Sequence, residues 1–113
     1  MAATHPSLYE AFSISSQEDA REAAVVPIGE LDLSCADELE REVRDLGAAG
    51  CRRIVLDLRQ LRFIDSTGLR ILLSLRNDAA RDGHDLKLVP GPPEVQRLFH
   101  LTATTGLFDW RDY

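Results

Sequence analysis

Apolar and polar residues alternate in blocks along the chain, and the spacing within each block predicts the element that it forms. Residues 54–56 (IVL) are a short apolar run closed by Asp57, which is typical of a strand buried on both faces. After a polar connection, residues recur at three- and four-residue spacing, as on one face of a helix; they are Leu69, Leu72, Leu73, Arg76, Ala79 and Ala80. The middle of the chain therefore predicts a strand, a connection and a helix that ends at Asp82-Gly83.

The first part of the chain predicts a β-hairpin. Residues 9–15 alternate in polarity and residues 23–28 are largely apolar, so both segments are interpreted as strands. The polar residues 16–19 are expected to turn the chain between them. Pro27 lacks a backbone N–H, which favours a position near a sheet edge or a bulge.

A helix is predicted after the hairpin. Ser34 is expected to be its N-cap, with Asp37 three residues on, where a capping-box acid would lie. The pattern predicts a charged outer face, most simply a solvated one, and a buried stripe of Ala36, Leu39, Val43 and Leu46. Gly47 and Gly50 are expected to end the helix.

The last third predicts one more strand and one more helix. Residues 85–89 (DLKLV) alternate as a strand with Leu86 and Leu88 inward. Because proline is tolerated in a first helical turn, residues 93–101 are expected to form a helix whose inward residues are Val95, Leu98 and Phe99. The tail, residues 102–113, is expected to pack back through Leu107, Phe108 and Trp110. The order β-β-α-β-α-β-α favours an α/β fold with a mixed sheet.

Length and composition indicate one domain. The chain has 113 residues, 44% of them hydrophobic and 28% charged, which is enough for a single core. We expect a flexible N-terminus over residues 1–8 and the folded domain over residues 9–113. The apolar runs fall far short of the ~20 residues of a membrane helix, and the first residues lack the pattern of a secretory signal. We therefore expect a cytoplasmic protein that does not enter a membrane.

Charge and cysteine content narrow the choice of partner. The net charge of −6 opposes binding to a nucleic acid, and the arginines are dispersed among acids instead of forming a basic stripe. A protein partner is therefore favoured over a nucleic acid. Cys35 and Cys51 lie alone in the sequence and are interpreted as reduced, buried thiols, neither metal ligands nor a disulfide.

The candidate site is the junction where the central strand gives way to its helix, residues 65–68 (DSTG). Functional sites in sheets with parallel strands gather at the carboxyl ends of the strands. Residues 29–32 and residues 57–68 each follow the carboxyl end of a predicted strand, so we expect both segments on one edge of the molecule.

Ser66 has two compatible interpretations. As the residue directly before a helical run, it is a natural N-cap. It is equally a candidate phosphate acceptor, because a phosphate at a helix N-terminus meets free N–H groups and the positive end of the helix dipole. Asp65, with Asp32 and Asp57, would then surround it with negative charge, and roughly two further charges would change the surface that a partner meets.

Enzymatic interpretations are not favoured. A nucleophilic serine needs a base and a group that orients the base, and the sequence places none of the three histidines beside Ser66. The chain also lacks a G-x-S-x-G elbow, an aspartic-protease signature and phosphate-binding loops. The three aspartates are better interpreted as capping or loop-bonding groups than as ligands of a cation. We expect no catalytic residue, metal or cofactor.

Five blocks in this order make the chain resemble the STAS domain, and more narrowly the bacterial anti-sigma factor antagonists. They are residues 29–32 (GELD), 54–58 (IVLDL), 63–69 (FIDSTGL), 86–89 (LKLV) and 95–102, which begins VQRLF and ends LT. The resemblance spans roughly residues 9–110, and residues 63–69 match the most specific block of the family.

The resemblance implies a single STAS-like domain, a mixed four- to five-stranded sheet backed by three to four helices. It also implies partner switching, in which the unphosphorylated antagonist binds an anti-sigma factor, itself a serine kinase of the GHKL type, and so frees a sigma factor. The kinase would phosphorylate Ser66 and a PP2C-type phosphatase would reverse this, with ATP and Mg²⁺ belonging to the kinase. The implied partner-contact residues are Asp32, Asp57, Asp65, Ser66, Thr67, Gly68 and Arg70.

Arg70 departs from the family pattern, which often has glycine after Asp-Ser-Thr-Gly-Leu, and it is expected to bear on which kinase is recognised. Other STAS-like proteins are scaffolds in stress-signalling assemblies, parts of lipid-transport complexes or tails of anion transporters. A scaffold or adaptor that is never phosphorylated is therefore the alternative. The intact DSTG of residues 65–68 favours the phosphorylated antagonist.

Overall fold

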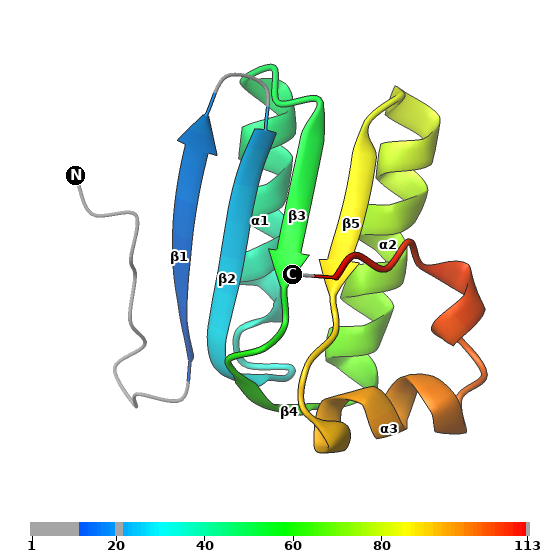
Figure 1. Ribbon diagram of the computed structural model, residues 1–113. Coiled ribbons are helices and arrows are strands. Elements are labelled where there is room, and N and C mark those ends of the chain that lie inside the picture. Colours follow the sequence, from blue (N-terminus) through cyan, green and yellow to red (C-terminus); the bar gives the residue numbers. More distant parts are fainter. Residues whose placement is uncertain (1–11, 20–21, 113) are drawn as a thin grey trace.

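The computed structural model of the chain describes residues 12–19 and 22–112 (Figure 1). The elements, in chain order, are β1 (Phe12–Asp19), β2 (Glu22–Leu31), α1 (Ala36–Ala48), β3 (Arg53–Asp57), β4 (Leu61–Ile64), α2 (Ser66–Asp82), β5 (Asp85–Val89), α3 (Pro93–Leu101) and the 3₁₀ turn η1 (Thr105–Leu107). This order confirms the α/β fold class. It adds β4, which the sequence predicted only as part of a connection.

One mixed, five-stranded sheet organises the molecule. Its order is β1-β2-β3-β5, and β4 pairs with β2 beyond the end of β3. β1 is antiparallel to β2, whereas the other pairs are parallel. Figure 1 shows α1 and α2 side by side behind the sheet and α3 along its lower edge. The predicted sheet of four to five strands, backed by helices, is confirmed.

The core lies between the sheet and these helices. The stripe predicted for α1 is buried throughout; it is Ala36, Leu39, Val43 and Leu46. Leu56 of β3, Leu72 of α2 and Phe99 of α3 are fully buried in the same cluster. Because each fully buried apolar side chain contributes roughly 1.5–3 kcal/mol, this burial is the main term that holds the helices against the sheet.

α2 turns a slightly different face inward from the predicted one. Its buried residues are Gly68, Leu69, Leu72 and Leu75, while Ala80 is exposed. Successive helical residues are about 100° apart, so a stripe that begins at Gly68 passes through Leu75 and leaves Ala80 to one side. Gly83 ends the helix in the left-handed conformation with φ 78°, as the predicted stop requires.

β1 runs further than the sequence predicted. Residues 16–19, predicted as a turn, pair with β2 from Ser16↔Val25 to Asp19↔Glu22, so that prediction is wrong. Ladder pairing with β2 outweighs the weak strand propensity of these polar residues. Residues 9–11 of the predicted strand lie outside the described residues. The hairpin itself is confirmed.

Pro27 lies in a central strand and not at an edge. β1 pairs along one side of it, and on the other side the partner of β2 changes from β3 to β4 between Val25 and Gly29. Gly29 N–H points to that second side, where it donates to the carbonyl of Gln60 at 3.2 Å. Backbone directions repeat every second residue, so the nitrogen of Pro27 faces the break between β3 and β4. The missing N–H therefore costs no ladder bond there, and the irregularity continues as a bulge directly after Gly29.

The start of α1 also differs from the prediction. Its N-cap is Cys35, which makes no side-chain cap bond. Ser34, the predicted N-cap, instead donates from Oγ (2.7 Å) and from its backbone N–H (3.0 Å) to Asp32 Oδ1. The predicted capping box of Ser34 and Asp37 is therefore wrong, because the carboxylate of Asp32 engages the hydroxyl that would have capped the helix.

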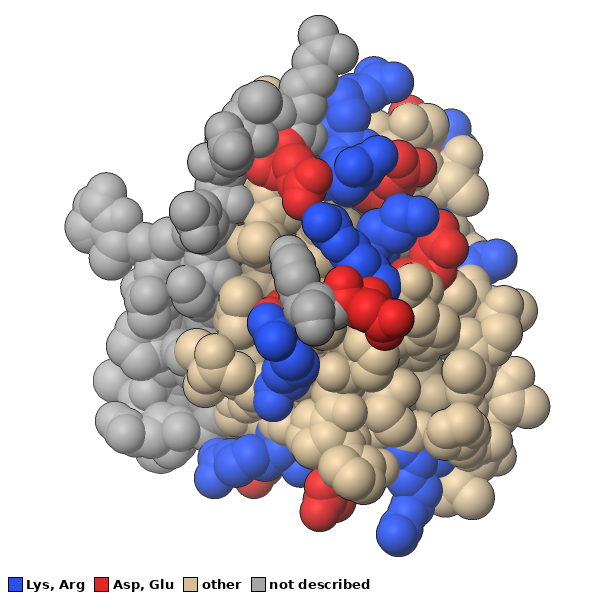
Figure 2. All heavy atoms as spheres, in the orientation of Figure 1, with Lys and Arg blue, Asp and Glu red and all other residues tan. Residues whose placement is uncertain are grey.

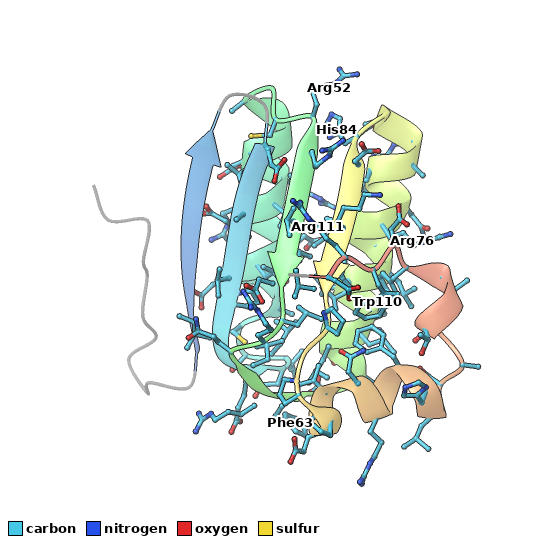
Figure 3. All side chains as sticks on the ribbon, in the orientation of Figure 1. Arg52, Phe63, Arg76, His84, Trp110 and Arg111 are labelled. Carbon is cyan, nitrogen blue, oxygen red and sulfur yellow. The ribbon has the colours of Figure 1, made fainter. Side chains whose placement is uncertain are left out.

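The tail folds back on the domain, as predicted. After η1, Trp110 forms a β-bridge with β5 and its ring packs edge to face on Phe99, with centroids 5.1 Å apart. Phe108 completes the group at 5.4 Å from Phe99. Arg76 of α2 donates from Nε to a carbonyl of η1, which ties the tail to that helix (Figure 3).

The face of the sheet turned away from α1 and α2 carries paired charges. Arg53 lies between Glu22 (3.7 Å) and Asp85 (3.6 Å), which start the two neighbouring strands. Arg111 reaches Glu22 from the tail at 3.2 Å. Figure 2 shows blue and red side chains interleaved over this face. Among the described residues, the dispersal of arginines among acids is thus present in space, and those on this face form no continuous basic stripe.

Candidate functional site

The two segments expected to share an edge do so. Asp65 N–H donates to the carbonyl of Leu31 at 3.2 Å, which joins the start of α2 to the end of β2. β4 runs parallel to β2 and brings residues 61–64 beside residues 29–31. The edge formed by the carboxyl ends of β2, β3 and β5, at the bottom of Figure 1, therefore holds the junction that the sequence singled out.

Asp65, and not Ser66, is the N-cap of α2. Its backbone is extended (φ −105°, ψ −175°), its Oδ1 accepts the N–H of Gly68 at 2.9 Å, and its carbonyl accepts the N–H of Leu69 at 3.0 Å. The prediction that Ser66 caps the helix is wrong. A carboxylate one residue earlier reaches the same N–H, and its charge also interacts favourably with the positive end of the helix dipole.

Ser66 is the first residue of the helix and its side chain is exposed. Within residues 12–19 and 22–112, the Ser66 hydroxyl has no hydrogen-bond partner. Thr67 is half-buried, and because successive helical residues are about 100° apart, its side chain points in a different direction from that of Ser66. Because Asp65 caps the helix, the Ser66 hydroxyl is available to a reagent or a partner.

Gly68 lets the start of α2 lie close against β2. A Cβ on this residue would lie 2.6 Å from the carbonyl oxygen of Leu31 and 3.0 Å from Cγ1 of Ile64. Gly68 is buried, so its part in the site is to bring Asp65 and Ser66 to the edge of the sheet.

The other two aspartates expected at the site are engaged in their own loops. The two bonds from Ser34 lower the pKa of the half-buried Asp32 carboxyl below its usual value. Asp57 is buried and accepts from Arg59 through Nε (3.0 Å), Nη2 (2.7 Å) and the backbone N–H (3.0 Å). These bonds, the side-chain ones above all, hold the pKa of Asp57 below its usual value. Arg59 offsets the charge of Asp57, so Asp57 shapes the loop more than it contributes charge to the surface.

Two exposed apolar side chains at this edge were missed by sequence reasoning. Leu33, in the loop after β2, is 75% exposed, and Phe63, on β4, is 47% exposed and pairs in register with Glu30. Phe63 is labelled at the lower edge in Figure 3. The sequence held no signal for Phe63, because β4 has only four residues and its two exposed residues are adjacent, so it shows no alternation of buried and exposed positions. Arg70, in the second turn of α2, is exposed.

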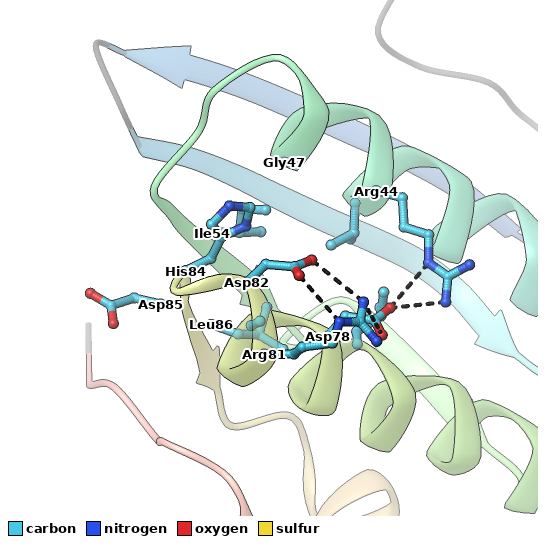
Figure 4. A pocket seen from close by; sticks show the side chains of 12 residues that line it. Arg44, Gly47, Ile54, Asp78, Arg81, Asp82, His84, Asp85 and Leu86 are labelled. Atoms are coloured by element: carbon cyan, nitrogen blue, oxygen red, sulfur yellow. Dashed lines mark hydrogen bonds and ion pairs between the residues drawn. The ribbon is translucent and has the colours of Figure 1, made fainter.

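A pocket of about 420 Å³ opens at the other end of α2, between α1, α2 and the start of β5 (Figure 4). Apolar side chains such as Ile54 and Leu75 line it. On its rim Asp78 accepts from Arg44 (2.9 Å) and Arg81 (3.2 Å), so the charged groups there are bonded to one another. The pocket lies along the second half of α2, from Leu75 onward, whereas Ser66 is the first residue of that helix, so the pocket is not part of the candidate site.

No group of three or more His, Cys, Asp or Glu able to hold a metal ion occurs among the described residues. The helices in the described ranges, residues 12–19 and 22–112, include none with the length and apolar character needed to cross a membrane.

Comparison with known proteins places the chain in a family. The family model described as "Mlab, STAS domain" matches residues 14–109. BtrV of Bordetella bronchiseptica, an anti-sigma factor antagonist by name, is 31% identical over 80 residues, which are 71% of this chain and 69% of that protein.

Solved structures share the fold. An anti-sigma factor antagonist from Mycobacterium paratuberculosis has a TM-score of 0.80 at 23% identity, with 94% of this chain and 89% of that chain covered. The phosphorylated form of the Bacillus cell fate determinant SpoIIAA has a TM-score of 0.69 at 17% identity, with 88% and 90% covered.

Proposed function

We propose that this chain, which belongs to the STAS domain family and within it to the anti-sigma factor antagonists, acts by partner switching. In its unphosphorylated form it binds an anti-sigma factor, a serine kinase of the GHKL type, and so releases a sigma factor. Phosphorylation of Ser66 by that kinase ends the interaction, and a PP2C-type phosphatase restores it. The chain is then a binding module and a phosphate acceptor, and not an enzyme.

The observation that carries this proposal is the exposed Ser66 hydroxyl at the first position of α2. Asp65 caps the helix in its place. A phosphate on Ser66 would meet the free N–H groups of the first turn and the positive end of the helix dipole, so the modified protein remains folded. That SpoIIAA, a protein of similar fold, exists in a phosphorylated form supports the same conclusion.

The partner surface is the edge around Ser66. We assign direct contact to the exposed or half-buried residues Asp32, Asp65, Ser66, Thr67 and Arg70, together with Leu33 and Phe63. Gly68 and Asp57 support this surface from below, through close packing and through the bonds of Arg59. Exposed apolar side chains beside polar ones are typical of the centre of a protein interface. A phosphate there brings roughly two negative charges next to Asp65, and a partner must desolvate these charges in order to bind.

The experiment is a binding series with the purified cognate kinase. Ser66→Ala is expected to bind like the wild type and to persist in the complex when ATP is added. Ser66→Asp is expected to bind at least about tenfold more weakly, because it adds charge and bulk at the centre of the surface. Phosphopeptide mass spectrometry on the protein from its own cells, with and without stress, shows whether Ser66 is occupied. Equal affinity of the two variants, with Ser66 unmodified in every condition, would exclude partner switching.

A scaffold or adaptor that is never phosphorylated, in a stress-signalling assembly or a lipid-transport complex, is the second candidate. The observation that favours it is that the family model matching residues 14–109 is described as "Mlab, STAS domain", a description that does not mention an antagonist. For such a protein the same edge binds its partner constitutively, and neither Ser66 variant changes the affinity.

A further inference from the structure

We propose that Arg70 is the intramolecular partner of phosphorylated Ser66, and that its guanidinium binds the phosphate across one turn of α2. The inference rests on the proposed function in one respect, that the phosphate is on Ser66. Beyond the proposed function, it identifies Arg70 as a residue that affects the ionisation of the phosphate and how long the phosphate stays on Ser66.

The geometry of the helix brings the two side chains together. Ser66 and Arg70 are four positions apart within α2, and both are exposed. Residues at this spacing lie one above the other on a helix, and long helical side chains lean back toward the N-terminus. Arg70 therefore leans over the first turn, where the phosphate would be. An acid that precedes its base by four residues is also the more favourable order.

Arg70 has no competing partner on its own helix. Its neighbours three and four positions away are Ser66, Thr67, Leu73 and Ser74, none of which carries a carboxylate. Arg70 makes no hydrogen bond or ion pair with any residue that the structure describes. Arg81 at the far end of α2 differs, because it is bonded to Asp78 and Asp82. An unpaired guanidinium thus lies one turn from the hydroxyl that the switch modifies.

The chemistry of the pair is favourable. A phosphoserine presents three acceptor oxygens and close to two negative charges near neutral pH. The planar guanidinium donates two parallel N–H bonds to such a group. The backbone N–H groups of Ser66 and Thr67 have no acceptor within the helix and supply further donors from below. The Asp65 carboxylate opposes the phosphate, but it already accepts the N–H of Gly68.

Phosphorylation then changes two features of the surface together. The partner meets a new phosphate, and it also loses a free cation, because Arg70 has turned to that phosphate. The pair also holds the phosphate against the helix, so a phosphatase must break it before hydrolysis. Arg70 is a positioning residue for the modified serine.

The test uses the full chain with phosphoserine installed at position 66 during synthesis, so that no kinase is needed. The second ionisation of the phosphate is followed by ³¹P NMR at low ionic strength. Arg70→Ala is expected to raise the pKa of the phosphate by about half a pH unit, the effect of one charge at about 5 Å in water. Arg70→Lys is expected to restore most of that difference. The acids of this edge, among them Glu30, Asp32, Asp57 and Asp65, are the same in every variant.

Arg52→Ala is the matched control, since it removes the same charge from an exposed arginine at the opposite edge of the sheet (Figure 3). It is expected to leave the titration unchanged. Coincident curves for the wild type, Arg70→Ala and Arg52→Ala overturn the proposal. Equal thermal midpoints of the unphosphorylated variants show that folding is not the cause of a difference. Failure of the proposed function looks different, because Ser66 would then carry no phosphate in cells while the installed phosphoserine still titrates with Arg70.

Discussion

Because Asp65 caps α2 and Ser66 does not, replacing each residue by alanine is expected to change stability by different amounts. This difference decides whether Ser66 has a structural role or a regulatory one. Asp65→Ala removes the acceptor of a 2.9 Å bond and leaves the N–H of the buried Gly68 without a partner. Loss of such a cap costs about 1–2 kcal/mol. For a chain of 113 residues this lowers the thermal midpoint by about 4–8 °C. Ser66→Ala removes an exposed hydroxyl that makes no bond within the described residues, so its effect is expected within about 0.5 kcal/mol.

Urea unfolding of the two alanine variants and the wild type, followed by circular dichroism, measures this difference directly. Asp65→Asn provides the control for charge, because asparagine caps a helix nearly as well as aspartate does. It is expected to recover most of the stability lost in Asp65→Ala, apart from the dipole contribution of about 0.3–1 kcal/mol. If Ser66→Ala is destabilised as much as Asp65→Ala, Ser66 carries the cap and the argument for a free hydroxyl fails.

Three further predictions test the parts of the edge. Gly68→Ala is expected to lower the free energy of unfolding by at least about 2 kcal/mol, because the clash with β2 outweighs the helix propensity that alanine gains. The control is Gly106→Ala, which has open space around its Cβ and is expected to change it by no more than about 0.5 kcal/mol. Equal urea midpoints of the two variants would contradict the close approach of Gly68 to β2. Asp57→Asn is expected to cost about 1–2 kcal/mol at pH 7. Because the folded pKa of this carboxyl is lowered, its contribution is complete above the usual value of about 4 and is lost as the pH falls through the lower folded value; a deficit that persists unchanged in acid would refute it. Phe63→Ser is expected to weaken binding to the cognate kinase at least about tenfold, while Leu101→Ser, 75% exposed at the end of α3, leaves it unchanged; equal losses would remove Phe63 from the interface.

The elements with an unambiguous period were predictable from the sequence. β5 and α3 begin and end where the pattern placed them, at residues 85–89 and 93–101. In both, a proline or glycine break marks a boundary, so the period of the apolar residues and the local stop signals agree. The same agreement explains why the buried stripe of α1 was correct residue by residue.

The elements that depend on long-range pairing were not predictable. β4 has four residues and exists because it pairs with β2, to which it is joined only through α1, β3 and their loops. Residues 16–19 form the end of β1 for the same reason, since their own polarity favours a turn. No local window holds this information, because the pairing partner lies outside it.

The predictions of the N-caps of α1 and α2 were wrong for a different physical reason. At both helix starts the sequence offers a serine and an aspartate within two residues, and either oxygen has the chemistry of a cap. At α2 the aspartate reaches the N–H of Gly68, and at α1 it binds the serine instead. Which oxygen caps the helix depends on the direction in which the chain leaves the preceding strand, and the pairing of that strand in the sheet sets this direction.

The order Asp-Ser-Thr-Gly at the start of α2 now has a physical explanation. A switch residue must change its chemistry without changing the fold, so it cannot also serve the fold. Asp65 caps the helix, Gly68 makes the close approach to β2, and the half-buried Thr67 faces away from the exposed position. Ser66 is the residue that remains exposed and makes no bond to any described residue, at the point where the helix dipole tolerates new negative charge. Under the proposed function, a phosphate would therefore be added and removed there at little cost to stability, which is the property that partner switching requires.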